Sequence, residues 1–247
     1  MYLKTKGLVL RETRIREADK LLTLLVPGRG RITVKARGVL KEKSRSAAAC
    51  QLFCWSSFEL YENRGLMTVT EAVPEERFEG LQNDAVKLSL AAYIAEICEL
   101  LSETDSVSDD LLRLALNMLY ALSARSDPPE LVRAAFEARA LVCAGYSPQI
   151  GVCAVCGGAP EAPVVSLTEL TVRCARCGAP APGERPLSNE AFAALSHFVS
   201  APLKRLLPPP AVPEPLAELT GVTESWADSR IGGRGSRNYY KGMLNYG

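Results

Sequence analysis

The amino-acid sequence predicts a multidomain α+β protein, in which a small β-barrel precedes a helical bundle that carries a four-cysteine insert. Three observations predict this class. Alternating apolar segments separated by glycine turns fill about the first 80 residues, apolar residues at helical spacing follow, and two Cys-X-X-Cys pairs interrupt the helical pattern. With 247 residues, 47% of them hydrophobic, the chain is long enough for about two domains with buried cores.

Five short segments in the first part of the chain have the alternation of β-strands, and turn sequences such as Pro27-Gly28-Arg29-Gly30 and Asn63-Arg64-Gly65 separate them. Five antiparallel strands in so short a stretch fit a small closed barrel, of which the OB-fold is the commonest that binds nucleic acid; an SH3-like barrel is the main alternative. We therefore expect an OB-fold nucleic-acid-binding domain over 1–80, with strands at Leu3–Glu12, Lys20–Val26, Arg31–Val39, Phe53–Tyr61 and Leu66–Ala72.

Helical spacing dominates after residue 80. Positions such as Leu88 and Ala92 mark one helix, Ser108 can cap a second, and Asp127-Pro128-Pro129 and Ser188 open two more. Apolar stripes of this kind are usually core, so they predict a bundle without chemistry of its own. We expect the helical domain in two parts, 81–150 and 184–220, with the insert at 151–183 and a flexible tail at 221–247.

The insert contains a near-repeat, Cys153-Ala154-Val155-Cys156-Gly157 and Cys174-Ala175-Arg176-Cys177-Gly178, whose two cysteine pairs are 17 residues apart. Two residues between cysteines let one tight turn present both sulfurs to a tetrahedral ion, and this spacing is typical of a zinc ribbon. Four thiolates close the coordination sphere, so we expect one structural Zn²⁺ per chain, bound by Cys153, Cys156, Cys174 and Cys177. Redox-active pairs or reduced thiols without metal are the alternatives.

The N-terminal part is strongly basic. Its first 45 residues contain 13 Lys or Arg and 4 Asp or Glu, a net charge of +9 in a chain whose total is +1. In the third strand Ile32, Val34 and Ala36 would face the core, while cations would project from the other face. Such a face suits a polyphosphate, although ordinary solvated charges are the alternative. The candidate DNA-binding residues are Arg14, Arg16, Arg29, Arg31, Lys35, Arg37, Lys41, Lys43 and Arg45.

Several function classes find no support in the sequence. The chain has a single histidine, His197, and we find no nucleotide-binding or metalloprotease signature, so we expect no enzyme; a hydrolase is the remaining catalytic alternative. No apolar run reaches the roughly 18 residues that span a bilayer, and the first residues lack a signal-peptide pattern. We therefore expect a cytoplasmic protein that does not contact membranes; association with the nucleoid would follow from DNA binding, not from these absences.

The order of several short segments resembles one family, the RecO recombination mediators of bacteria. The resemblance covers roughly residues 1–200 and includes Lys6-Gly7-Leu8-Val9-Leu10-Arg11, Glu17–Leu25, Ala36-Arg37-Gly38 leading to Lys43-Ser44, Gln51-Leu52-Phe53, and Phe136–Leu141 leading to Gly145-Tyr146-Ser147-Pro148.

The resemblance implies an N-terminal OB-fold, a helical domain and a zinc-ribbon insert. It also implies a protein that binds single- and double-stranded DNA, anneals complementary strands, and helps to load recombinase together with RecR and the C-terminal tail of single-strand-binding protein. Two other functions stay open from the residues alone: an RNA or RNA-polymerase accessory factor, and a basic face that docks an acidic protein partner.

Overall fold

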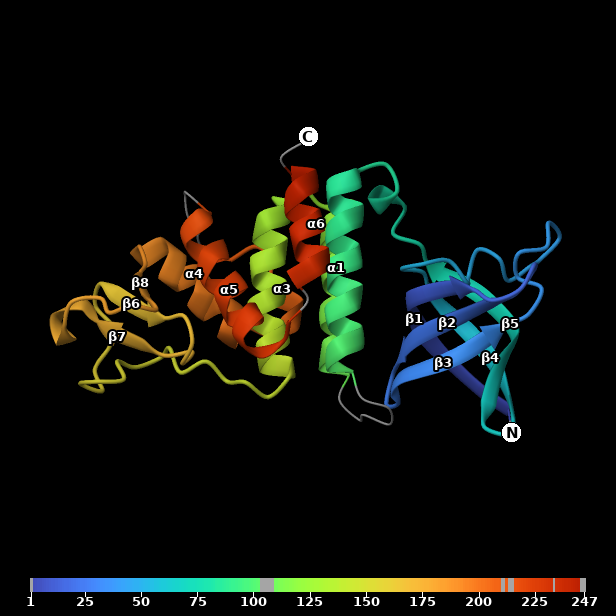
Figure 1. Ribbon diagram of the computed structural model, residues 1–247, viewed down its shortest axis with the longest axis horizontal. Coiled ribbons are helices and arrows are strands. Elements are labelled where there is room, and N and C mark those ends of the chain that lie inside the picture. The colour runs from blue at the N-terminus through green and yellow to red at the C-terminus, as the bar shows by residue number, and fades with distance from the viewer. Residues whose placement is uncertain (1, 103–108, 210–211, 213–215, 233, 245–247) are drawn as a thin grey trace. The chain divides into compact units, whose positions relative to one another are not determined.

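The structure, a computed structural model, describes the whole chain except residues 1, 103–108, 210–211, 213–215, 233 and 245–247. It divides into two compact units, one formed by Met1–Ala124 with Tyr239–Gly247 and the other by Arg125–Asn238. Each unit is described by itself below. Figure 1 shows the barrel, the helices and the small second sheet.

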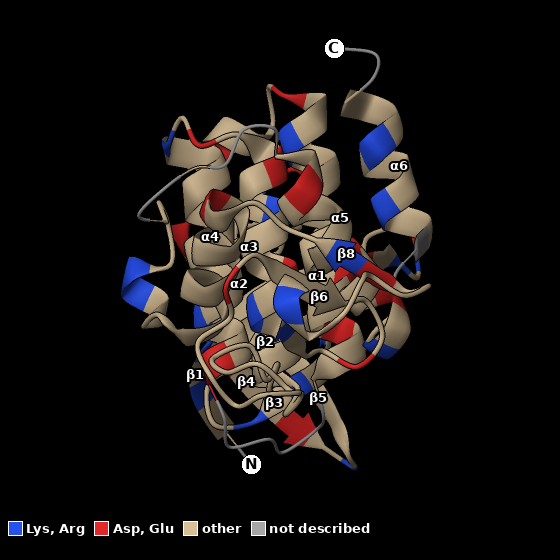
Figure 2. Cartoon of the chain, turned by 90° about the vertical axis from the view of Figure 1, so that its left-hand side faces the viewer, with Lys and Arg blue, Asp and Glu red and all other residues tan. Residues whose placement is uncertain are grey.

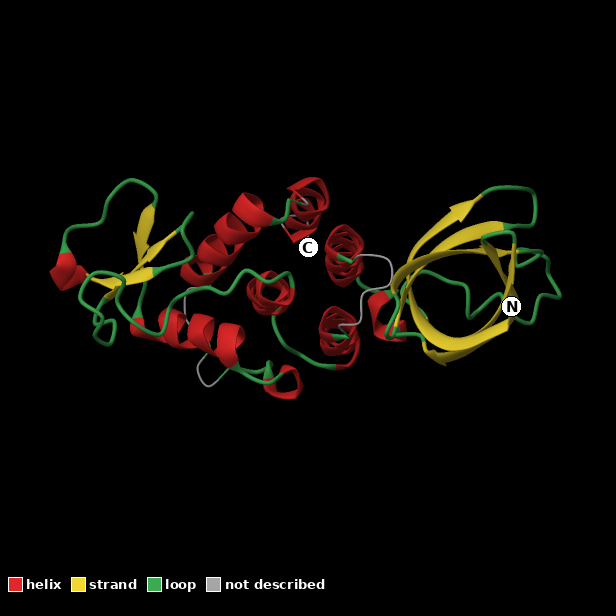
Figure 3. Ribbon diagram, turned by 90° about the horizontal axis from the view of Figure 1, so that it is seen from below, coloured by secondary structure: helices red, strands yellow, loops and turns green. Residues whose placement is uncertain are grey.

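The first unit begins with a closed barrel in the order β1-β2-β3-β5-β4 (Figures 1 and 3). Neighbouring strands are antiparallel except for β3 and β5, which pair in parallel, and β1 pairs with both β2 and β4. A closed five-stranded barrel of this kind is an OB-fold, which confirms the predicted fold class. The strands are β1 (Tyr2–Arg14), β2 (Lys20–Val26), β3 (Gly30–Ala36), β4 (Trp55–Asn63) and β5 (Leu66–Glu76).

The alternation predicted for the third strand is confirmed. Ile32, Val34 and Ala36 are at most 8% exposed and lie in the barrel core, while the residues between them point outward. The strand ends at Ala36, earlier than expected, because Gly38 adopts a left-handed conformation with φ of 64° and the chain turns there. Arg37 therefore lies in a turn rather than on the strand face.

Two helices follow the barrel in the first unit, α1 (Ala85–Leu101) and α2 (Asp110–Ala124), after a short 3-10 turn at Glu79–Leu81. Asp84 caps α1, because its carboxylate accepts hydrogen bonds from the backbone N–H groups of Val86 and Lys87. Leu88 and Ala92, which marked this helix in the sequence, are exposed, and the opposite face is the buried one. Ser108, the cap expected for α2, lies outside the described residues.

The second unit contains the remaining predicted elements. Helix α3 opens at Pro129, as expected, and α4 is capped by Ser188, whose Oγ accepts from the Ala191 backbone N–H at 3.2 Å. The cysteine pairs flank a three-stranded sheet in the order β7-β6-β8, with Cys174 at the end of β7. The elements are α3 (Pro129–Cys143), β6 (Pro163–Ser166), β7 (Val172–Cys174), β8 (Glu184–Pro186), α4 (Asn189–Ser200), α5 (Ala217–Arg230), and 3-10 turns at Ala175–Cys177 and Leu203–Arg205.

The segment 221–247, expected to be a flexible tail, requires a correction. Its described residues complete α5 and form a further helix, α6 (Arg234–Leu244). The physical reason is burial: Trp226 is fully buried and donates its indole N–H to the Ser166 carbonyl at 2.8 Å, and Arg237 is 1% exposed. Helix α6 carries Lys and Arg but no Asp or Glu (Figure 2), and Arg237 finds its carboxylate partners on α3 and α5.

No helix among the described residues combines the length and apolar character that crossing a bilayer requires.

Candidate nucleic-acid interface and metal centre

Two loops meet at one end of the barrel, 15–19 between β1 and β2 and the first part of the segment that follows β3. The Leu40 backbone N–H donates to the Ala18 carbonyl at 3.0 Å, and the Gly38 N–H donates to Asp19 Oδ1 at 2.8 Å. Val39 is 3% exposed and packs into the barrel core. An apolar anchor and two hydrogen bonds therefore hold both loops in one place.

These two loops and the last residue of β1 bring six of the nine candidate cations to the same end of the barrel. We call them the basic rim, which consists of Arg14, Arg16, Arg37, Lys41, Lys43 and Arg45. All six are exposed, and within the described residues no carboxylate forms an ion pair with any of them. Two exposed carboxylates of the same loops, Glu17 and Glu42, form no ion pair with the part of the chain that the structure describes, and they are outnumbered by the six cations, so the rim is strongly electropositive.

Arg14 also shapes the rim. Its guanidinium donates to the carbonyl oxygens of Arg16, at 3.4 Å, and Glu17, at 2.8 Å. These bonds fold the 15–19 loop back on the end of β1 without neutralising the charge. The remaining donors of Arg14 stay available for an anion.

The other three candidate cations lie elsewhere, which corrects the expectation of a free cationic strand face. Lys35 is only 13% exposed at its side chain and forms an ion pair with Asp19 at 3.2 Å. Arg31 donates to the Glu99 carbonyl at 3.0 Å, and Arg29 occupies the turn at the opposite end of β2 from the rim. The sequence could not reveal this, because the partners of Lys35 and Arg31 come from other segments.

Asp19 is a site residue that sequence reasoning did not identify. The Gly38 backbone N–H and the Lys35 ammonium lower the pKa of its carboxyl group, so it stays ionised well into the acid range. Reversing Lys35 to Glu would place a second carboxylate against Asp19 and disturb the rim loops. A substitution of Lys35 would therefore change the loop structure as well as the charge, whereas a substitution of the exposed Arg37 tests the charge alone.

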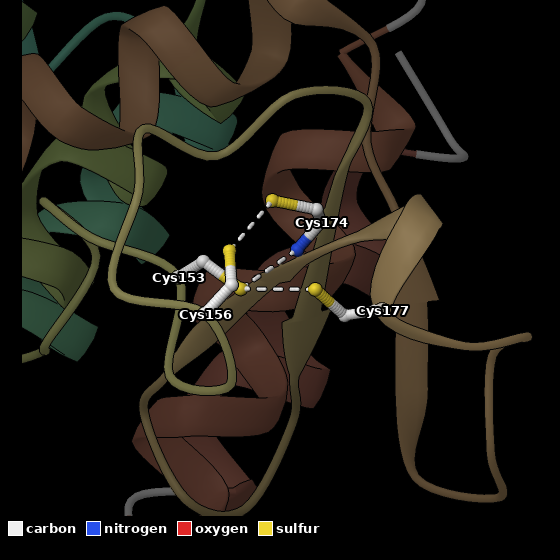
Figure 4. A group of neighbouring side chains, drawn as sticks. All are labelled: Cys153, Cys156, Cys174 and Cys177. Carbon is white, nitrogen blue, oxygen red and sulfur yellow. Dashed lines mark hydrogen bonds between the residues drawn. The ribbon is translucent and has the colours of Figure 1, made fainter.

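The four predicted metal ligands come together in the second unit, as Figure 4 shows. All four Sγ atoms lie within 4.8 Å of one another, with Cys153 and Cys177 at 3.7 Å and Cys156 and Cys174 at 3.9 Å. Because the first pair lies in the loop before β6 and the second at the end of β7, the small sheet brings the two knuckles together. This cluster could hold one metal ion.

The backbone around Cys153 favours its thiolate form. The Cys156 backbone N–H is the main group that lowers the pKa of Cys153, to about 6, with a further contribution from the Cys174 N–H, which lies 3.3 Å from Cys153 Sγ. Thiolate is the form that ligates metal. A set of four sulfur donors suits Zn²⁺ and leaves no open position for a water molecule or substrate.

Comparisons with known proteins cover almost the whole chain. Two family models match it, "Recombination protein O N terminal" over residues 1–78 and "Recombination protein O C terminal" over residues 82–238. A protein named DNA repair protein RecO from Acetivibrio thermocellus is 30% identical over 97% of this chain and 94% of its own length. The protein of the same name from Desulforudis audaxviator is 34% identical over 82% of this chain and 81% of its own length. The one from Halalkalibacterium halodurans is 27% identical over 94% of this chain and 91% of its own length.

The first model covers the barrel, and the second covers both cysteine pairs and all of the helices up to the start of α6. The relatives share one name and are aligned along most of their own lengths. The chain therefore belongs to the RecO family, whose members act in recombinational DNA repair.

Proposed function

We propose that this protein is a DNA-binding recombination mediator that binds single- and double-stranded DNA through the basic rim and anneals complementary strands. The observation that carries the proposal is a group of six exposed cations at one end of an OB-fold barrel, none of which forms an ion pair with another residue that the structure describes. The names of the relatives, DNA repair protein RecO, support the same role.

Annealing requires two polyanions to approach each other, and cations that contact phosphates lower their repulsion. Phosphate contacts also leave the base edges free to pair. Aromatic stacking would contribute little at the rim, because the exposed pair Tyr2 and Tyr61, whose ring centroids are 5.0 Å apart, lies at the opposite end of β1. Binding should therefore depend on charge rather than on sequence.

RecR and single-strand-binding protein are the partners that we propose from the family. The acidic C-terminal tail of single-strand-binding protein is a polyanion, so charge could guide its encounter with this chain. With these partners the protein would help to load recombinase on single strands.

The function is tested by an annealing assay with complementary oligonucleotides, titrated with salt. About five phosphate contacts to a single strand give a log–log slope of the binding constant against salt near −3.5, so both affinity and annealing should fall steeply. Equal-length DNA and RNA are compared at fixed salt, because preference for RNA would favour an RNA or RNA-polymerase accessory factor. Absence of annealing at low salt would contradict the proposal.

We further propose that Cys153, Cys156, Cys174 and Cys177 bind one structural Zn²⁺ per chain. The purified protein should contain about one equivalent of zinc by elemental analysis, and Cys174→Ser should lose it. Because a closed site contributes folding energy, metal loss should expose 151–183 to limited proteolysis. Cys143→Ser, which removes a thiol outside the cluster, is the control and should retain the metal. A Cys174→Ser protein with a full equivalent of zinc would exclude this site.

A further inference from the structure

Arg173 lies in β7, directly before the ligand Cys174, and its guanidinium is directed into the second knuckle. The side chain is 12% exposed. One terminal nitrogen donates to the Gly178 carbonyl at 2.6 Å, and the other donates to the Ala179 carbonyl at 2.7 Å. A single side chain thus binds both peptide carbonyls that follow the last ligand, Cys177.

The guanidinium is itself held by a carboxylate. Arg173 Nε donates to Glu184 Oε1 at 2.9 Å, and Nη2 bonds the second oxygen at 2.5 Å. Glu184, at the start of β8, also accepts the Ala181 backbone N–H at 2.8 Å. The pair therefore closes the whole 178–184 loop against the strand that carries Cys174, and the bidentate geometry gives it a defined orientation.

The backbone after Cys177 needs this support. Gly178 has a φ of 140°, a conformation outside the range that other residues favour, and a short 3-10 turn at Ala175–Cys177 precedes it. Arg173 binds the Gly178 and Ala179 carbonyls, so it restricts the backbone immediately after the peptide that joins Cys177 to Gly178. That backbone continues from Cys177, whose Sγ lies 3.7 Å from Cys153 Sγ.

The charge of the cysteine cluster also favours a cation beside it. A divalent ion bound by four thiolates would have a net charge of −2, and because Cys153 and Cys174 are buried, nearby cations or N–H donors would stabilise that charge. The guanidinium of an arginine stays protonated in proteins, and Arg173 Nη1 also donates to the carbonyl of the ligand residue Cys174 at 3.4 Å. Arg173 thus remains charged beside the sulfur cluster.

We infer that Arg173 is a positioning residue of the metal centre, which holds the second knuckle in the geometry that lets Cys174 and Cys177 bind the ion together with the first knuckle. The inference rests on the proposed zinc site and goes beyond it, because it assigns metal retention to a side chain that is not a ligand. Hydrogen-bond partners of this kind typically change metal affinity by about 10- to 100-fold.

The same knuckle offers a matched control. Arg176 lies between the two cysteines, its side chain is 73% exposed, and it pairs at 3.3 Å with Glu161, which is 68% exposed. Replacing it removes the same charge from the same loop but no bond to the backbone after Cys177. An exposed pair of this kind contributes little to stability.

The experiment measures Zn²⁺ affinity of the full-length chain by competition with a chromophoric chelator, and Co²⁺ binding by its visible absorption bands. Arg173→Gln should bind Zn²⁺ about 10- to 100-fold more weakly than the parent chain, with altered Co²⁺ bands, whereas Arg176→Gln should stay within about threefold. Arg173→Lys keeps the charge but loses the planar fork, so it should resemble Arg173→Gln. Parent-like affinity of either Arg173 variant would overturn the inference.

Glu184→Gln provides a second variant that retains the shape of the loop. It removes the charge that orients Arg173, so its affinity should fall in the same direction by a smaller factor, and parent-like Co²⁺ bands together with parent-like affinity would count against the inference. Far-UV circular dichroism checks that each variant is folded. If the parent chain itself binds no metal, the zinc proposal fails. If the parent chain binds metal and the Arg173→Gln variant binds it equally well, only the inference about Arg173 fails.

Discussion

The double variant Arg37→Glu, Lys41→Glu should bind single-stranded DNA about 25-fold more weakly than the parent chain at about 0.1 M salt. Each phosphate contact contributes a slope of about −0.7, which amounts to about fivefold in affinity per contact at that salt concentration. Two lost contacts give the expected factor, and repulsion by the new carboxylates would increase it. Charge reversal should leave the barrel folded, because both residues are exposed and neither has an ion-pair partner among the described residues.

The measurement is a fluorescence-anisotropy titration at several salt concentrations. Besides the weaker affinity, the log–log slope should become shallower by about 1.4, which corresponds to two fewer phosphate contacts at about 0.7 each. Strand annealing should slow in parallel. An unchanged slope in a folded variant would remove Arg37 and Lys41 from the DNA interface.

The matched control is Arg29→Glu, Arg64→Glu, which makes the same change of charge at the opposite end of the barrel. Arg29 lies in the β2–β3 turn and Arg64 in the β4–β5 turn, away from the loops of the basic rim. If the rim is the interface, this control should weaken binding by less than about threefold through long-range electrostatics alone. Equal losses in both variants would instead indicate binding to the whole basic N-terminal part.

Arg237→Met should destabilise the second unit by about 3 to 5 kcal/mol, because it breaks a buried ion-pair network and leaves more carboxylates than cations in it. The Arg237 side chain is 1% exposed and lies 3.6 Å from a Glu137 oxygen that is equally buried. It also pairs with Asp228, and with Glu224 at 3.8 Å. Glu137 would keep Arg133 at 3.1 Å and the Thr223 hydroxyl at 2.7 Å, but the acids around it would outnumber the cations.

Urea unfolding followed by circular dichroism measures the effect. The control is Arg113→Met, which removes an exposed pair with Asp110 and should change stability by less than about 0.5 kcal/mol. A triple replacement of Arg133, Glu137 and Arg237 by apolar residues should recover much of the loss, since it removes the charges together. If Arg237→Met is as stable as Arg113→Met, the buried network does not hold α6.

Local patterns identified most of the fold and part of the candidate sites. Three of these patterns involve only neighbouring residues: the strand alternation in 31–36, the Ser188 cap and the two Cys-X-X-Cys pairs. The structure confirms the corresponding elements and the cysteine cluster. The patterns failed where a distant segment decides burial. Leu88 fits an apolar stripe yet is exposed, whereas Ser89 and Tyr93 are buried because the packed face of α1 is the other one.

Features that depend on neighbouring residues were determined by the sequence, and features that depend on distant residues were decided by the tertiary structure. By itself the sequence determined the barrel, most of the helices, the four clustered cysteines and a basic N-terminal part, because periodicity, capping and ligand spacing are properties of nearby residues. Only the tertiary structure decided which of the N-terminal cations form no ion pair with the described residues, that Asp19 pairs with Lys35, and that the described part of the last segment is helical around Arg237. Those features depend on charges that meet across tens of residues, and only the folded chain brings such charges within a few ångströms of each other.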